Sequence, residues 1–326
     1  MSFYLVTGGA GFIGSHLVEE LLRRGQRVRA VDNLSTGKRA NLDSAIEAAS
    51  LSQSGNGPAV EFVQGDLADL EVAHAAVAGV DYVLHQAAQP SVPRSVDDPI
   101  GANRANVQAT VNVLVAARDA KVRRLVFAGS SSVYGDQPEL PKHEEMSTRP
   151  QSPYALQKLI GEQYLRLFTE LYGLETVTTR YFNVFGPRQD PSSPYSGVIS
   201  LFIKAVSEGR APTVHGNGEQ TRDFTFVANV VDGVLRAVEA PGVAGDVINV
   251  ATGARISLKE LLGTITRILG SSVEPIYGPT RAGDVRDSQA AIGKAERLLG
   301  YRPTVPFEEG LRRTIAWAQQ GAHAQR

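Results

Sequence analysis

Short hydrophobic runs alternate with longer stretches of helical periodicity over the first half of the chain. Six runs are rich in β-branched and aliphatic residues at consecutive positions, which predicts strands covered on both faces. Such strands, separated by segments long enough for helices, are typical of a parallel sheet wound by right-handed crossovers. The predicted strands are Tyr4–Thr7, Arg27–Asp32, Val60–Gln64, Tyr82–Gln86, Leu125–Ala128 and Thr176–Arg180. The expected fold class is therefore α/β, with a doubly wound, Rossmann-like parallel sheet.

Beyond residue 180 the pattern is less regular and richer in glycine and proline. Hydrophobic residues at helical spacing predict a helix over Leu258–Leu269, and Ser257 with Glu260 forms a capping box at its start. The polar stretch of small residues at 44–58 is predicted to be a surface loop with a frayed helix. We expect a doubly wound domain over residues 1–180, to which the chain returns around 224–251, and a smaller mixed α/β domain over 181–326.

Composition excludes several classes of function. The 326 residues include 33 Lys plus Arg against 34 Asp plus Glu, and this balance argues against nucleic-acid binding as the main activity. Cysteine is absent, which excludes disulfides, thiolate nucleophiles and cysteine-ligated metals, and we expect no metal site. No secretory signal is recognisable, and no hydrophobic run approaches the ~20 residues that cross a bilayer. We expect a soluble, cytoplasmic protein without a membrane partner.

A glycine-rich segment follows the first predicted strand directly and opens an amphipathic helix, predicted over Ile13–Arg24. Gly8 permits a tight turn, Gly11 lets the backbone approach a pyrophosphate, and Gly14 lets the helix pack close to the sheet. Between a strand and a helix, this Gly-x-x-Gly-x-x-Gly spacing predicts a dinucleotide site. A purely structural glycine turn is the alternative.

An acidic residue ends the second predicted strand at the position expected for a ribose ligand. Asp32 lies 18 residues beyond Gly14, and a carboxylate there accepts hydrogen bonds from an adenosine ribose. The same carboxylate would repel a 2′-phosphate, so the sequence favours NAD over NADP. Lys38 or Arg39 nearby could weaken that preference.

Tyr154 and Lys158 form the first candidate catalytic pair. Ser152 is a predicted N-cap followed by proline, so the two side chains lie one turn apart on the same helix face. A phenol has a pKa of ~10, and a nearby ammonium together with the helix N-terminus stabilises the phenolate. Such a pair can move a proton from a sugar hydroxyl. Taken alone, an exposed polar pair is an equally ordinary interpretation.

A run of three serines follows the fifth predicted strand. Ligands bind at the carboxyl edge of an open α/β sheet, which is where Ser130, Ser131 and Ser132 would lie. When the three serines are considered alone, a flexible, hydrogen-bonded turn is the better explanation. Together with Tyr154, Lys158 and the glycine turn, they favour catalysis.

Over nearly its whole length the chain resembles the extended short-chain dehydrogenases/reductases of the nucleotide-sugar epimerase group. Many motifs occur in the family's order, which makes the resemblance specific. They are TGGAGFIG at 7–14, GDL at 65–67, HQAAQPSV at 85–92, SSSVYG at 130–135, SPYALQK at 152–158, RYFNVFGP at 180–187, TRDFTFV at 221–227 and RAGDVRDSQA at 281–290.

The resemblance implies roles for individual residues, with NAD as cofactor and a UDP-sugar as substrate. Ser130, Tyr154 and Lys158 would be catalytic. The cofactor would contact Gly8, Gly11, Phe12, Ile13, Gly14, Asp32, Asn33, Asp66, Leu67, Ala87, Ala88, Asn106, Tyr154 and Lys158. The substrate would contact Ser91, Ser130, Ser131, Ser132, Tyr154, Asn183, Gln189, Arg222, Arg281, Asp284 and Ser288. For Asn183 and Asp284, structural bonding within loops is an open alternative.

The resemblance also suggests which reaction the chain catalyses. Dehydratases and decarboxylases of this group carry an acidic residue just after the serine or threonine of strand five, whereas here Ser131 follows Ser130. UDP-glucuronate 4-epimerases typically have threonine in place of Asn183 and an arginine where this chain has Asp190. What remains is 4-epimerisation of a neutral UDP-hexose through a transient 4-keto sugar.

The sugar preference depends on one position. Galactose-type epimerases often carry a bulky residue where this chain has Ser288, and a small side chain leaves room for an N-acetyl group. The chain is most similar to bacterial UDP-N-acetylglucosamine 4-epimerases. Alternatives are a UDP-glucose/UDP-galactose 4-epimerase and a non-catalytic NAD-sensing or scaffold protein. A solvent-facing Ser288 would remove the argument for an acetylated sugar.

A homodimer is expected from the family, whose members often pair helices equivalent to Ala102–Ala120 and Tyr154–Tyr172. The second helix has a hydrophobic face that could equally belong to the intramolecular core. Its members are Leu156, Leu159, Ile160, Leu167, Phe168 and Leu171.

Overall fold

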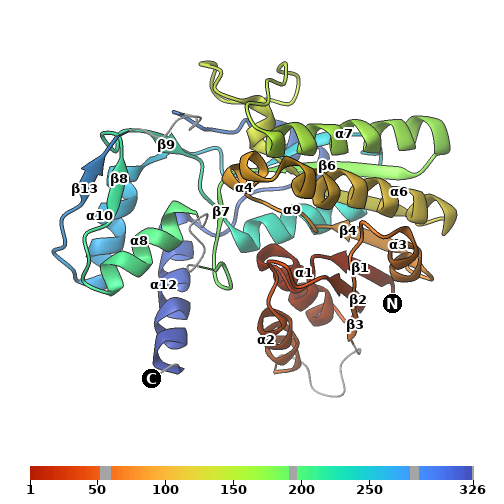
Figure 1. Ribbon diagram of the computed structural model, residues 1–326, viewed down its shortest axis with the longest axis horizontal. Helices are drawn as coiled ribbons and strands as arrows, with labels where there is room; N and C mark the ends of the chain where they lie inside the picture. The colour runs from red at the N-terminus through yellow and green to blue at the C-terminus, as the bar shows by residue number, and fades with distance from the viewer. Residues whose placement is uncertain (52–59, 191–196, 280–285, 325–326) are drawn as a thin grey trace.

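A seven-stranded parallel sheet organises the larger part of the molecule (Figure 1). The computed structural model describes residues 1–51, 60–190, 197–279 and 286–324. The strand order is β11-β6-β5-β4-β1-β2-β3, and every pairing is parallel. The strands are β1 Phe3–Thr7, β2 Arg27–Asp32, β3 Val60–Gln64, β4 Tyr82–His85, β5 Arg124–Ser130, β6 Glu175–Tyr181 and β11 Val247–Val250. The predicted doubly wound fold is confirmed, and β11 adds a seventh strand to the six predicted ones.

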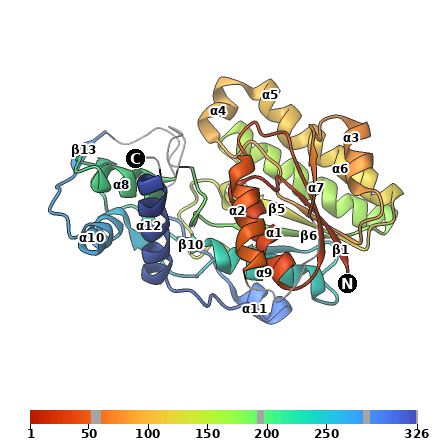
Figure 2. The ribbon, with the colours of Figure 1, turned by 90° about the horizontal axis from the view of Figure 1, so that it is seen from below.

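Helices cover both faces of this sheet, and each face has its own hydrophobic core (Figure 2). One core is completed by α1 Phe12–Arg23, α2 Arg39–Ser50, α9 Val227–Glu239 and α11 Gly293–Leu299. The other is completed by α3 Leu70–Val77, α6 Ala109–Asp119 and α7 Pro153–Tyr172. Short elements connect them: α4 Val92–Asp97, α5 Pro99–Asn103, the π-helical turn η1 Arg104–Gln108 and the 3₁₀ turn η2 Ser131–Tyr134.

The prediction of a surface loop at 44–58 is wrong for its first part. Residues 44–50 belong to α2, a regular helix whose Leu42, Ala45 and Ala49 face the core at helical spacing. Small residues obscured this pattern because alanine carries a weak hydrophobic signal. The remainder, from 52 to 58, lies outside the described residues.

The expected helix at Ala102–Ala120 is interrupted. It is built from α5, the wider π-helical turn η1 and α6. In the turn, the Thr110 hydroxyl donates to the backbone oxygen of Asn106 at 2.6 Å. This side-chain bond serves the Asn106 carbonyl at the point where the regular α-helical pattern of backbone bonds is interrupted. The turn thereby orients Asn106 toward the carboxyl edge of the sheet.

A second body of structure lies beside that edge and contains α8, α10 and α12 (Figure 1). Four aromatic rings, Phe185, Phe224, Phe226 and Phe307, contact one another at its centre. Its helices are α8 Val198–Ser207, α10 Leu258–Leu269 and α12 Phe307–Ala324, and its short strands are β7 Val184–Phe185, β8 Thr213–His215, β9 Thr221–Arg222, β10 Thr225–Phe226, β12 Ile256–Ser257 and β13 Ile276–Gly278. The predicted bounds of α10 and its capping box are confirmed. The domain boundary at residue 180 stays a prediction.

Among the described residues, no helix has both the length and the hydrophobicity needed to span a bilayer.

Candidate active site

The glycine turn packs tightly at the carboxyl end of β1. Gly8 has a φ of +64°, and its carbonyl accepts the N–H of Gly11 at 2.9 Å. A Cβ on Gly14 would lie only 2.1 Å from the Gly8 oxygen. Phe12 and Ile13 then begin α1, and in the described chain its first turn holds no acidic residue and no side-chain cap. The exposed N–H groups and positive end of this helix can therefore receive an anion.

Asp32 fixes the same turn from the neighbouring strand. Its Oδ2 accepts the N–H of Ala10 at 3.0 Å, and its Oδ1 accepts the N–H of Leu34 at 2.8 Å. Burial raises the pKa of Asp32, while these two bonds act in the opposite direction. Because each carboxylate oxygen has more than one lone pair, these bonds are compatible with a ribose hydroxyl as a further donor. Next to it, Asn33 accepts the N–H of Ser35.

Both basic residues near the predicted ribose site are paired with carboxylates. Lys38 Nζ lies 2.8 Å from Asp190 Oδ2, and Arg39 Nε lies 2.9 Å from Asp43 Oδ1. These pairings favour NAD over NADP, because neither cation is held ready for a 2′-phosphate. The pairing with Lys38 also offsets the charge of Asp190, so discrimination against a uronate would depend on other residues.

A hydrogen-bonded chain connects β1, β4 and the π-helical turn. Thr7 Oγ1 accepts two backbone N–H groups, those of Gln86 and Ala87, so its proton points to His85 Nδ1 at 2.7 Å. The Thr110 hydroxyl already donates to the turn, so it accepts from His85 Nε2 at 3.0 Å. Burial lowers the pKa of His85 to about 3. A neutral histidine therefore fixes the backbone that runs into Ala88.

The remaining predicted cofactor residues lie along the same edge. Asn106 accepts the Gln89 N–H at 2.7 Å and donates to Gln157 Oε1 at 2.8 Å, which connects the segment after β4 to the start of α7. Asp66 accepts the Ala68 N–H and pairs with an arginine of η1. The adjacent Leu67 is buried.

Tyr154 and Lys158 lie on the same side of α7. Lys158 is buried, donates to the Ala128 oxygen at 2.8 Å, and places its Nζ 6.0 Å from the centre of the Tyr154 ring. Burial lowers the pKa of Lys158 to about 8, and Glu162 acts in the opposite direction. Burial also raises the pKa of Tyr154, while a hydrogen bond with Ser130 lowers it. The predicted N-cap Ser152 accepts the Ala155 N–H and starts this helix.

The three serines occupy the turn between β5 and η2. Ser130 and Ser132 place their hydroxyl oxygens 2.8 Å apart, and Ser131 begins η2. Ser130 therefore connects the phenol of Tyr154 to the serine turn. Ser91, at the N-cap of α4, accepts the Arg94 N–H.

The predicted substrate residues of the second half are partly engaged within the protein. Asn183, at a φ of +34°, donates to the Asp223 oxygen at 3.1 Å. This bond agrees with the alternative that Asn183 has a structural role within its loop. Gln189 accepts the Ser200 hydroxyl. Arg222 donates to the Thr221 and Arg286 oxygens. Arg281 and Asp284 lie outside the described residues.

Ser288 does not face solvent. It is 9% exposed, and its backbone N–H donates to the Thr221 oxygen at 3.1 Å, directly before Arg222 in β9. The segment at 286–291 also bonds Lys142 through backbone groups of Gln289 and Ala291.

Two charged residues beneath this site are not among those predicted from the sequence. Glu162 and Arg180 form a buried ion pair next to Lys158. The spacing of Glu162, one helical turn after Lys158, could have identified this residue from the sequence.

Comparisons with known proteins agree with this geometry. A model of the NAD-dependent epimerase/dehydratase family matches residues 4–251. A UDP-glucose 4-epimerase of Mycolicibacterium smegmatis is 41% identical over 313 residues, which cover 95% of this chain and 96% of that protein. A UDP-N-acetylglucosamine 4-epimerase of Methanobrevibacter ruminantium, solved with UDP-N-acetylmuramic acid, has a TM-score of 0.91 at 37% identity, covering 98% of this chain and 99% of that one. The UDP-glucose 4-epimerase of Thermus thermophilus, solved with NAD, has a TM-score of 0.85 at 37% identity over 97% and 99% of the two chains.

The chain belongs to the NAD-dependent epimerase/dehydratase family, and its cofactor is NAD. The described residues fit this cofactor. The glycine turn leaves no room for side chains, and the acid at the end of β2 suits an unphosphorylated ribose. In addition, Gln86 Nε2 and Gln89 Oε1 are buried without a partner among the described residues, which is unusual for polar atoms unless a ligand completes them.

Proposed function

We propose that the protein is a UDP-sugar 4-epimerase that interconverts UDP-N-acetylglucosamine and UDP-N-acetylgalactosamine. The observation that carries this choice of sugar is the small, buried side chain of Ser288 beside Arg222. A bulky residue there would close the space next to the sugar's C2 substituent. A UDP-glucose/UDP-galactose 4-epimerase is the second candidate, because the Mycolicibacterium smegmatis relative carries that name.

The proposed reaction needs one base that acts in both directions. Tyr154 takes the proton of the sugar's 4-hydroxyl during oxidation and returns it when the ketone is reduced. Ser130 orients the hydroxyl, and Lys158 stabilises the phenolate. When bound, NAD would supply the redox chemistry at C4 of the sugar, and the glycine turn with Asp32 would hold it. The 4-keto sugar must turn over between the two halves of the reaction.

The nucleotide is proposed to anchor the substrate while the sugar turns. Arg222 is assigned to a phosphate of UDP because a guanidinium offers paired, permanently charged donors. Asn183, Arg281 and Asp284 are proposed to complete this cradle. Affinity for UDP rather than for the sugar then allows the ring to present either face.

Proton NMR of the anomeric region tests the proposal directly. NAD-loaded protein incubated with UDP-N-acetylglucosamine should produce UDP-N-acetylgalactosamine until equilibrium is reached. A parallel incubation with UDP-glucose distinguishes the two candidate sugars. Failure to convert any UDP-hexose, with NAD demonstrably bound, would contradict the enzyme and favour the NAD-sensing or scaffold alternative.

A further inference from the structure

Glu162 continues the line of catalytic side chains along α7. Tyr154, Lys158 and Glu162 are spaced at i, i+4 and i+8, so they lie on one face of the helix. Glu162 is 2% exposed, although glutamate is among the residues least often buried. A buried carboxylate needs a partner to offset the loss of hydration.

Arg180 in β6 is that partner. Its Nε lies 3.0 Å from Glu162 Oε1 and its Nη2 lies 2.7 Å from Oε2, a two-pronged arrangement with Arg180 itself 4% exposed. The guanidinium also lies over the ring of Tyr134, 4.7 Å from its centre, and the Tyr134 hydroxyl donates to Asn249 at 2.7 Å. Arg180 is thus held between a carboxylate and an aromatic ring.

The Glu162–Arg180 ion pair lies next to β5, the strand whose Ala128 oxygen accepts a hydrogen bond from Lys158. Arg180 is paired in register with Gly129, and a Cβ on Gly129 would come within 3.1 Å of Glu162 Oε1. The preceding residue, Ala128, accepts the Lys158 ammonium. Glycine at 129 therefore lets the carboxylate approach the end of β5 beside Lys158.

The titratable and charged groups that face Lys158 come from two strands and from its own helix. His85 on β4 is neutral, Arg180 on β6 is a cation, and Glu162 and Tyr154 share α7 with the lysine. With two cations and one carboxylate, the buried group has a net charge of +1 before Tyr154 ionises. One phenolate brings it to zero, so the surrounding charges act against the burial that raises the pKa of Tyr154.

We propose that Glu162, fixed by Arg180, is a positioning residue that keeps the buried Lys158 protonated and so allows it to support the phenolate of Tyr154. The proposal rests on the proposed roles of Tyr154 and Lys158 in the reaction. Burial alone disfavours the ammonium, and Glu162 is the carboxylate that opposes this effect. Removing its charge should release the Lys158 proton at lower pH.

The test compares Glu162→Gln with Glu175→Gln in NAD-loaded protein. The control removes a carboxylate bonded to Arg124 at 2.6 Å, at the opposite end of the β5–β6 pair. Two readouts are used: the pH profile of kcat and the NMR titration of ¹³Cε-labelled lysines. With seven lysines in the chain, Lys158→Met assigns the relevant signal.

In Glu162→Gln, the pKa of Lys158 measured by NMR and the pKa of the alkaline limb of the kcat profile should both fall by about one unit or more. A shift of this size is the lower end of the effect that a nearby opposite charge has on a pKa. Glu175→Gln should leave both unchanged. A parent-like titration in folded Glu162→Gln, or an equal shift in the control, would overturn the proposal.

If Glu162→Gln does not fold, Glu162→Asp retains the charge at a shorter reach. It should keep Lys158 protonated at the pH optimum of the parent, and loss of protonation there despite the retained charge would contradict the electrostatic role. Because NMR reports Lys158 without turnover, an inactive parent would refute the proposed function while leaving this inference separately measurable.

Discussion

At the scale of single residues, the proton affinity of Tyr154 differs from the expectation. The sequence predicted that Lys158 and the helix N-terminus would lower the pKa of this phenol, but burial raises it. The ammonium is bonded to the Ala128 oxygen and lies 6.0 Å from the ring centre, so spacing along the helix overstated its direct effect. Spacing alone could not show how deeply the pair is buried.

Tyr154→Phe should lower kcat at least 100-fold, the lower end of the roughly 10²- to 10⁴-fold contribution of a general acid/base group. Steady-state kinetics with the preferred UDP-hexose measures the loss, and NAD content measured on the denatured protein provides the control. Most of the bound NAD should be retained, because Tyr154 is one of many expected cofactor contacts and does not contribute to the fold of the glycine turn. A fully active variant would contradict the assignment of Tyr154.

Ser288→Tyr should reduce kcat/KM for UDP-N-acetylglucosamine much more than for UDP-glucose. A tyrosine side chain would fill the space that we assign to the acetyl group, whereas a hydroxyl at C2 needs little room. The ratio of the two kcat/KM values is the measurement, since a general loss of folding would lower both alike. An unchanged ratio would show that Ser288 does not determine the sugar preference.

At the scale of elements, the sequence predicted six of the seven strands of the large sheet and helices near α1, α6, α7 and α10, but it missed the short strands of the second body and several local departures. Hydrophobic runs locate buried parallel strands well because both faces of each strand are covered. The helix at Arg39–Ser50 was predicted only as a frayed helix within a loop, because alanines form much of its buried face. The π-helical turn was also missed, because it depends on Thr110 bonding the Asn106 carbonyl rather than on any repeating pattern.

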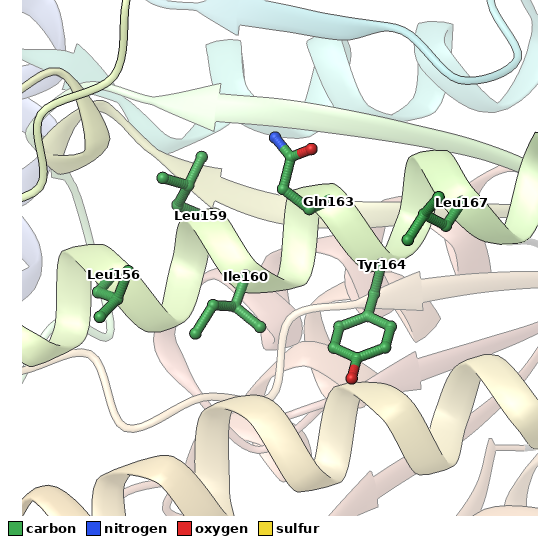
Figure 3. Close-up of a pocket in the computed structure, with 6 residues that line it drawn as sticks. All are labelled: Leu156, Leu159, Ile160, Gln163, Tyr164 and Leu167. Atoms are coloured by element: carbon green, nitrogen blue, oxygen red, sulfur yellow. The ribbon is translucent and has the colours of Figure 1, made fainter.

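The hydrophobic face of α7 divides between two uses. Leu165 and Phe168 are buried, whereas Leu156, Leu167 and Leu171 are 48%, 39% and 67% exposed. Figure 3 shows how side chains from successive turns, Leu156, Leu159, Ile160, Gln163, Tyr164 and Leu167, line a shallow surface pocket. We propose that this exposed stripe forms a homodimer interface, which the intramolecular core leaves uncovered.

Leu167→Glu should convert such a dimer to a monomer, because a carboxylate would be buried without a partner at the interface. Size-exclusion chromatography with light scattering measures the mass of the parent and the variant. Ile276→Glu is the matched control, since Ile276 on β13 is 59% exposed and lies away from α7. A monomeric parent, or a Leu167→Glu protein that remains dimeric, would contradict the interface.

At the scale of the whole molecule, the site depends on contacts between distant segments. The sequence motifs indicated Tyr154, Lys158 and the three serines, because each of these residues lies within a short local pattern. Sequence alone could not pair Glu162 with Arg180, or bring Ser288 beside Thr221, because these contacts follow from the winding of the sheet and the return of the chain. The motifs therefore predict the catalytic residues, and the topology brings together the charged residues that surround them.

Two ion pairs connect the loop after β7, at residues 188 and 190, to the part of the chain that surrounds the glycine turn. Asp190 holds Lys38, and Arg188 contacts Glu19 and His16 of α1. Detaching this loop from the glycine-turn region would mean breaking both connections. An enzyme that ends each catalytic cycle with its oxidant restored does not need to exchange it, so ion pairs that hold this loop against the glycine-turn region would not slow the turnover of such an enzyme.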